Sequence, residues 1–381
     1  MGEMCEKDDG EGMSGARKEL TDQPGCACDP RSMSGTREEL TGVPGLARLV
    51  VVDRTGSTND DLRSALTGVD GRLDLRVAAA WPHISALWAR RQDAGRGRAG
   101  RRWITPPGSA LTVSFVLRPL VPAAALAWLP LLAGLAVRDV VDAILIAARV
   151  PWRAGTKWPN DVVLVPEGRA GTVGAGAGTT AGAAGAGTGT SPAPEPIEIP
   201  GWGRARKVAG ILAEFIPAAE GAGARASTTR VGAAGAVGAT GAGAVSADRG
   251  AACAVVLGIG VNTGQSASEL PVPWATSLRL AGARVEPRAL LDPLCARLDE
   301  LVTAWEAGGG DPDAADGALG VALRRACTSL GRRVRVDAPD GVLRGTAVDI
   351  APGLVLRGAD GTVRTVDAGD VSHVRTDGAA D

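Results

Sequence analysis

The loop around which this chain is organised reads Gln92-Asp93-Ala94-Gly95-Arg96-Gly97-Arg98-Ala99-Gly100-Arg101-Arg102-Trp103. Its three glycines let the backbone bend and approach a ligand, and its four arginines supply guanidinium groups that surround an anion. This composition predicts a phosphate-binding loop. The loop matches no phosphate-binding fingerprint of fixed spacing, so the residues alone leave two alternatives open, a solvated arginine-rich loop and a nucleic-acid contact.

Strands are predicted on both sides of this loop. Residues 84–88 form an apolar run before it, and residues 111–117 alternate apolar and small polar side chains after it, as on a half-buried strand. Upstream, residues 49–52 predict a first strand. Ser57 has Asp60 three positions later, which predicts the start of a helix.

Later segments predict two buried helices and a second domain. The helices are expected from Pro130 to about residue 146 and along the apolar stripe of residues 290–305, which Pro293 either kinks or restarts. Further strands are expected at residues 162–165, 208–215 and 254–260. Short alternating segments predict a small β-barrel with strands at residues 334–336, 342–350, 353–356, 362–366 and 371–374.

Three segments lack the periodicity of folded structure. Residues 1–46 contain a polar repeat that begins at Met13 and again at Met33, and we expect this arm to be disordered. The Gly-, Ala- and Pro-rich tracts at about residues 166–205 and 217–250 separate the predicted strands. We expect both tracts to be disordered insertions.

Composition excludes several classes of protein. The formal net charge of −1 argues against bulk attraction to nucleic acid or to an anionic membrane. The six cysteines match neither a zinc site nor a disulfide framework, which indicates reduced thiols in a cytoplasmic protein. Residues 120–137 carry no charge, but their prolines and small residues favour a buried helix over a membrane span.

Four motifs follow one another in a recognisable order. They are the arginine–glycine loop, Lys-Trp-Pro-Asn-Asp at 157–161, Gly-Ile-Leu-Ala-Glu at 210–214 and Gly-Ile-Gly-Val-Asn at 258–262, with Ser-Thr-Asn at 57–59 upstream. From about residue 48 to 375 the chain resembles bacterial biotin protein ligases of the monofunctional type. The resemblance implies an α+β fold, with a mixed-sheet catalytic domain like that of class II aminoacyl-tRNA synthetases (47–327) and an SH3-like C-terminal β-barrel (328–376).

The resemblance also implies a reaction. Biotin and ATP would form biotinyl-5′-AMP, and the biotinyl group would pass to a lysine on the biotin carboxyl carrier domain of an acyl-CoA carboxylase. Mg²⁺ would arrive with the nucleotide, and no dedicated metal site is expected. The alternatives are a lipoate-type protein ligase and, from a different class, a nucleic-acid-binding regulator. The oligomeric state, including a homodimer, stays open.

Site residues follow from the resemblance by motif position. Arg98 and Lys157 would be catalytic, since fixed cations offset the repulsion between two reacting anions. Asp161 would orient Lys157 or cap a turn. The biotin site would comprise Ser57, Thr58, Asn59, Gln92, Arg96, Gly97, Arg98, Lys157, Gly210 and Leu212, and the ATP site Arg98, Trp103, Asn160 and Asn262.

The chain departs from the family pattern in two further respects. Ala99 stands where some relatives carry another arginine, which bears on how firmly the loop holds an adenylate. Residues 1–46 show no helix-turn-helix pattern, so the repressor role of bifunctional relatives is not expected here.

Overall fold

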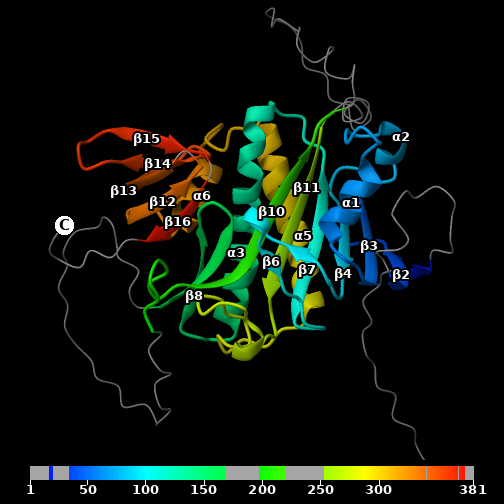
Figure 1. Ribbon diagram of the computed structural model, residues 1–381. Coiled ribbons are helices and arrows are strands. Elements are labelled where there is room, and N and C mark those ends of the chain that lie inside the picture. The colour runs from blue at the N-terminus through cyan, green and yellow to red at the C-terminus, as the bar shows by residue number, and fades with distance from the viewer. Residues whose placement is uncertain are drawn as a thin grey trace, which may run out of the picture.

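A mixed sheet of nine strands dominates the computed structural model, which describes residues 17–19, 34–167, 197–218, 253–339, 341–367 and 369–373. The strand order is β1-β2-β3-β4-β7-β11-β10-β9-β8 (Figure 1). In chain order the strands are β1 (Arg17–Glu19), β2 (Ser34–Leu40), β3 (Arg48–Arg54), β4 (Ser85–Ala89), β7 (Ala110–Leu117), β8 (Trp152–Lys157), β9 (Asp161–Pro166), β10 (Arg206–Ile216) and β11 (Ala254–Asn262). Only β3 and β4 are parallel neighbours in this sheet, which confirms the mixed-sheet prediction.

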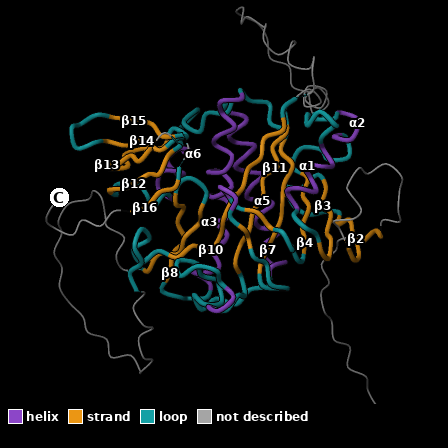
Figure 2. The backbone as a smooth tube through the Cα atoms, viewed as in Figure 1, coloured by secondary structure: helices purple, strands orange, loops and turns teal. Residues whose placement is uncertain are grey.

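Helices cover both faces of the sheet (Figures 1 and 2). The long helices α3 (Leu129–Ala147) and α5 (Pro287–Ala307) pack on one face, and α1 (Thr58–Leu66) and α2 (Leu75–Ala78) lie on the other. All eight residues of β7 are therefore buried, and the prediction of a half-buried strand is wrong. Pro293 lies inside α5, which continues through it. No helix among the described residues combines the length and apolar character needed to cross a bilayer.

The N-terminal arm contributes strands to the sheet. β2 pairs antiparallel with β3, and β1 pairs with β2, so disorder throughout residues 1–46 is a wrong prediction. The pairing uses main-chain hydrogen bonds and an ion pair of 3.2 Å between Arg48 and Glu39. Strands held in this way need few apolar side chains, which explains why hydrophobic periodicity missed them.

Some sequence predictions lie outside the described residues. They include the first copy of the N-terminal repeat, which begins at Met13, apart from its residues 17–19, and the central parts of both low-complexity tracts, 168–196 and 219–252. The end of the first tract is described, from residue 197 onward, and it folds against the rest of the protein. The prediction that this tract is disordered up to residue 205 is therefore wrong at its C-terminal end.

A second, five-stranded antiparallel sheet forms the C-terminal part of the described chain, in the order β15-β14-β13-β12-β16. Its strands are β12 (Arg333–Ala338), β13 (Gly341–Ile350), β14 (Leu354–Arg357), β15 (Val363–Val366) and β16 (Asp370–His373), and the short helix α6 (Ala318–Ala326) precedes them. Each of the five predicted strand segments corresponds to one of these strands. The indole Nε1 of Trp158 donates to the carbonyl of Pro352 at 3.1 Å, which joins this sheet to the larger one.

His373 makes the junction between the two sheets sensitive to pH. Burial, reinforced by the charges of Lys157 and Arg332, lowers the pKa of His373 from 6.5 to about 4. Because the unfolded chain binds this proton more readily, the neutral histidine contributes stability above pH 6.5 that is lost as the pH falls toward 4.

We expect the free energy of unfolding to fall by about 2 kcal/mol between pH 7 and pH 5 on account of His373. The His373→Gln variant removes the titrating group, so its pH dependence over this interval should be smaller by that amount. Urea unfolding of both proteins at the two pH values measures the difference. If the free energy of unfolding changes by the same amount between the two pH values in both proteins, His373 is not the responsible group.

Candidate active site

A cavity of about 680 Å³ opens over the middle of the larger sheet. The N-terminus of α1, the arginine–glycine loop, β10, β11 and strand β16 of the C-terminal sheet all contribute to its wall. Every site residue implied by the family resemblance lines it, namely Ser57, Thr58, Asn59, Gln92, Arg96, Gly97, Arg98, Trp103, Lys157, Asn160, Gly210, Leu212 and Asn262. Segments that are far apart in the sequence therefore meet in one space.

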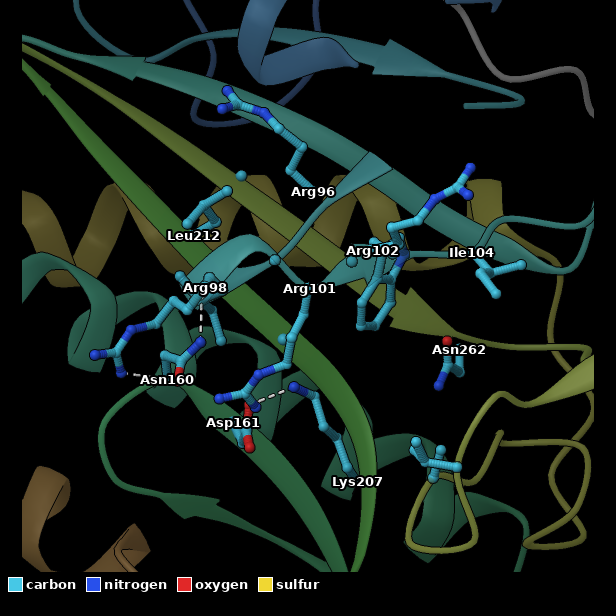
Figure 3. A pocket seen from close by; sticks show the side chains of 18 of the residues that line it. Arg96, Arg98, Arg101, Arg102, Ile104, Asn160, Asp161, Lys207, Leu212 and Asn262 are labelled. Atoms are coloured by element: carbon cyan, nitrogen blue, oxygen red, sulfur yellow. Dashed lines mark hydrogen bonds and ion pairs between the residues drawn. The ribbon is translucent and has the colours of Figure 1, made fainter. Parts of the chain in front are cut away.

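The arginine–glycine loop is a small hairpin. Strands β5 (Gly95–Arg96) and β6 (Arg102–Trp103) pair, and the tip between them turns through Ala99 and Gly100, which have φ values of 54° and 71°. Figure 3 shows Arg98 and Arg101 pointing toward Asn160 and Asp161, while Arg96 and Arg102 point away from them. The four arginines therefore do not converge on a single anion position.

Arg98 connects the loop to the sheet. Its Nη1 donates to Oδ1 of Asn160 at 3.3 Å, and Nδ2 of Asn160 donates to the carbonyl of Ile211 on β10 at 2.8 Å (Figure 3). Burial lowers the pKa of the Arg98 guanidinium, although its carboxylate neighbours oppose this shift. Since the hydrogen-bond partner is a neutral amide in a partly buried place, the positive charge of Arg98 can act strongly on an incoming anion.

Arg96 has carboxylate partners instead. Its Nη2 donates to Oε2 of Glu214 at 3.0 Å and also to the carboxylate of Asp60. Glu214 accepts a further hydrogen bond of 2.7 Å from Nδ2 of Asn59. A ligand carboxylate that binds Arg96 must therefore compete with Glu214 and Asp60.

A network of neutral polar groups lies beside Arg96. Oε1 of Gln92 accepts from the backbone N–H of Thr58 at 2.8 Å and from its hydroxyl at 3.0 Å. The hydroxyl of Ser114 lies 2.6 Å from that of Thr58 and donates to Oδ1 of Asn59 at 2.6 Å. The sequence analysis named Thr58, Asn59 and Gln92 but missed Ser114. The alternation along β7 had already placed Ser114 among the polar positions of that strand. Ser57 serves as the N-cap of α1 and accepts from the N–H of Asp60 at 3.4 Å.

The Gly-Ile-Gly motif of β11 leaves room for two of these side chains. A Cβ at Gly258 would lie 2.3 Å from Oδ1 of Asn59, and a Cβ at Gly260 would lie 2.4 Å from Cε2 of Trp103. Only glycine permits such close approach. The indole of Trp103 therefore lies directly against the sheet, and its buried Nε1 has no hydrogen-bond partner in the part of the chain that the structure describes.

The cavity contains two lysines in different surroundings. Lys157 is only 4 % exposed, and its Nζ donates to the carbonyl of Val371 and lies 4.3 Å from the centre of the Trp202 ring. Burial lowers the pKa of Lys157. Nζ of Lys207 lies 2.5 Å from Oδ1 of Asp161 (Figure 3). The same Nζ lies 5.9 Å from the centre of the Trp103 ring. The hydrogen bond of Asp161 thus goes to Lys207 rather than to Lys157.

Sequence reasoning missed Lys207 for a geometric reason. Regular alternation along β10 would place residues 207 and 210 on opposite faces of the sheet. A bulge between Lys207 and Ala209 shifts the register, and Nζ of Lys207 comes within 3.2 Å of the position that a Cβ on Gly210 would take. The sequence contained one signal for Lys207, namely that a basic residue stands three positions before the Gly210 motif.

The far end of the cavity contains two tryptophans and Asn262. The rings of Trp202 and Trp274 stack with their centres 5.8 Å apart and an angle of 11° between their planes. Both ends of the Asn262 amide are already engaged, since Nδ2 donates to the carbonyl of Thr276 at 3.0 Å and Oδ1 accepts from Gln265 at 2.9 Å. Asn262 therefore fixes the loop that follows β11.

Comparison with protein families gives two matches. Residues 73–223 match the biotin/lipoate A/B protein ligase family, and residues 329–374 match the biotin protein ligase C-terminal domain. The biotin–[acetyl-CoA-carboxylase] ligase of Mycobacterium tuberculosis is 31% identical over 333 residues, which cover 86% of this chain and 90% of that protein. The enzyme of the same description from Paracoccus denitrificans is 40% identical over 111 residues, or 29% of this chain and 40% of that protein.

Solved structures show a similar fold. The biotin protein ligase from Aquifex aeolicus in complex with biotin and ATP superposes with a TM-score of 0.52 at 20% sequence identity. The match covers 86% of this chain and 99% of that one.

Replacement of Gly260 by alanine should release the arginine–glycine loop, because the new methyl group takes space that the Trp103 indole occupies. We expect trypsin to cleave at the loop arginines roughly 10-fold faster in Gly260→Ala than in the wild type. Gly264→Ala is the matched control, since a Cβ there meets nothing closer than 3.4 Å. Equal cleavage rates in the two variants would contradict the conclusion that the Trp103 indole needs the space at Gly260.

Proposed function

The chain belongs to the family of biotin protein ligases, and from this premise we propose how its cavity works. It activates biotin with ATP to form biotinyl-5′-AMP. It then passes the biotinyl group to a lysine on the biotin carboxyl carrier domain of an acyl-CoA carboxylase. The observation that carries this proposal is the meeting of the arginine–glycine loop, a neutral polar network and two lysines in one cavity.

The first step requires positively charged side chains whose positions are fixed before the substrates bind. The carboxylate of biotin attacks the α-phosphorus of ATP and pyrophosphate leaves, so negative charge accumulates on the phosphoryl oxygens. Arg98 offers a planar guanidinium whose hydrogen-bond partner is a neutral amide, and Lys157 offers an ammonium that donates to the neutral carbonyl of Val371. The charge of Lys207 is instead paired with Asp161 at 2.5 Å, so we assign this role to Lys157.

We assign biotin to the polar network at the start of α1. Asn59, Gln92 and Ser114 present amide and hydroxyl groups that suit the donors and acceptors of a ureido ring. Arg96 lies beside this network and would bind the carboxylate of biotin after exchange with Glu214. Leu212 and Gly210 on β10 supply the adjoining wall.

We assign the nucleotide to the opposite half of the cavity. The Nε1 of Trp103, for which the described residues provide no partner, is a donor for the adenylate, and the loop fixed by Asn262 adjoins it. Mg²⁺ would enter with the phosphates of ATP. The hairpin loop over the product would exclude water, which hydrolyses mixed anhydrides.

We infer a cytoplasmic location from the thiols and from the reaction. The three cysteines within the described residues, Cys253, Cys295 and Cys327, are free. Free thiols and the use of ATP support a reducing, cytoplasmic location.

We expect biotin to support ATP–pyrophosphate exchange by the purified chain with Mg²⁺, and we expect lipoate not to do so. With ATP and biotin present, a biotin carboxyl carrier domain should become labelled on its acceptor lysine, as measured by mass spectrometry. Exchange with lipoate alone would favour the lipoate-type alternative. A lack of exchange with either acid would remove the proposed activity altogether.

The two lysines give a direct test of the mechanism. Lys157→Gln should slow adenylate formation by roughly 10²- to 10³-fold, because it removes a fixed charge that acts on the transition state. Lys207→Gln should slow it by less than about 10-fold, since its charge is already paired with Asp161. Thermal unfolding of both variants checks that they are folded. The reverse order of the two effects would move the catalytic role to Lys207.

A further inference from the structure

Glu214 on β10 contacts two residues that line the cavity, although it does not line the cavity itself. Its side chain is only 16 % exposed. Oε2 of Glu214 accepts hydrogen bonds from Nη2 of Arg96 at 3.0 Å and from Nδ2 of Asn59 at 2.7 Å. One carboxylate therefore contacts both the residue to which we assign the carboxylate of biotin and a residue to which we assign its ureido ring.

Arg96 is shared between two carboxylates. Among the described residues, its hydrogen bonds are all donated by the single atom Nη2, to both carboxylate oxygens of Glu214 and to Asp60. This arrangement is not the parallel two-nitrogen contact in which an arginine binds a carboxylate most strongly. The side chain of Asp60 is 48 % exposed, so Glu214 is the firmer of the two partners. Arg96 is therefore occupied, but by contacts that an incoming carboxylate can replace.

Glu214 keeps other partners if Arg96 moves to a ligand. Asn59 still donates to it, and Nη1 of Arg63 lies 3.9 Å from its Oε1. A largely buried carboxylate that retains a hydrogen bond and a nearby cation avoids most of the free-energy cost of losing one partner. Arg96 can therefore leave Glu214 and return to it.

The charge of the ligand carboxylate changes during the proposed reaction. A carboxylate oxygen of biotin forms a bond to the α-phosphorus of ATP, the bond from that phosphorus to the bridging oxygen of the β-phosphate breaks, and pyrophosphate leaves with the bonding electrons. The carboxylate has then become the neutral acyl group of biotinyl-5′-AMP. Arg96 loses an anionic ligand group at this step, whereas Glu214 remains a carboxylate.

We propose that Glu214 is a competing counter-ion for Arg96, which gives up the guanidinium to the carboxylate of biotin and regains it when the acyl-adenylate forms. This competition limits how strongly Arg96 stabilises the unreacted carboxylate, so the attacking oxygen stays nucleophilic. Glu214 is a positioning residue, because it acts through Arg96. The inference rests on the proposed function, since it concerns biotin bound at that site.

The test uses Glu214→Gln, whose amide oxygen can still accept from Asn59 but carries no charge. Isothermal titration calorimetry without ATP measures the binding of biotin and of biotinamide, which has no carboxylate. We expect biotin to bind about 10-fold more tightly to Glu214→Gln than to the wild type, and biotinamide to bind both proteins equally. An equal gain for both ligands, or no gain for biotin, would overturn the proposal.

Glu167→Gln is the matched control, because it removes the same charge elsewhere. Glu167 pairs with Arg153 at 2.5 Å and does not line the cavity. Its replacement should leave the affinity for biotin unchanged. A gain equal to that of Glu214→Gln would mean that the net charge of the protein, rather than Glu214, sets the affinity, and would refute the competition.

ATP–pyrophosphate exchange gives a second readout. In Glu214→Gln the KM for biotin should fall about 10-fold and kcat should fall roughly 5-fold, because a firmer contact with Arg96 stabilises the bound substrate more than the transition state. A rise in KM would show that Glu214 only supports the shape of the site, and the proposal would be wrong. If neither protein catalyses exchange but the difference in biotin affinity appears, the proposed activity fails and the competition for Arg96 stands. If neither protein binds biotin, both fail.

Discussion

The structure depends on the packing of one short hairpin against two strands. The indole of Trp103 lies where Gly260 leaves space, and Arg98 reaches Asn160, which is itself bonded to β10. These contacts bring positive charge over the sheet in a chain whose formal net charge is only −1. Since the partner of Arg98 is neutral, its charge is available to a ligand. The glycines of β11 thus matter because they allow the hairpin to lie close to the sheet.

The C-terminal sheet takes part in the same cavity. Val371 accepts from Lys157, Asp370 pairs with Arg101 of the hairpin, and His373 bonds to the segment that presents Trp202. Strand β16 therefore adjoins both the hairpin and the buried lysine. A loss of packing in the small sheet should alter the geometry of the cavity, because these contacts connect the two sheets.

Local patterns in the sequence predicted much of this arrangement. The Ser57 N-cap, the strands on both sides of the hairpin and the five C-terminal strands follow from capping, alternation and turn residues, which act over a few positions. The errors come from longer-range effects. β2 is held by pairing rather than by apolar residues, β7 is covered on both faces, a bulge turns Lys207 into the cavity, and Trp202 is ordered by Trp274 and β16. None of these four effects can be predicted from the hydrophobic periodicity of a short segment.

The central claim is that Arg98 and Lys157 meet over the activated phosphate of biotinyl-5′-AMP. A crystal structure of the chain with a stable sulfamoyl analogue of this adenylate tests it most directly. We predict the sulfamoyl oxygens within about 3 Å of both the Arg98 guanidinium and the Lys157 ammonium, with the ureido ring at Asn59. A sulfamoyl group bound to Lys207 instead, or an analogue bound away from the hairpin, would contradict the account.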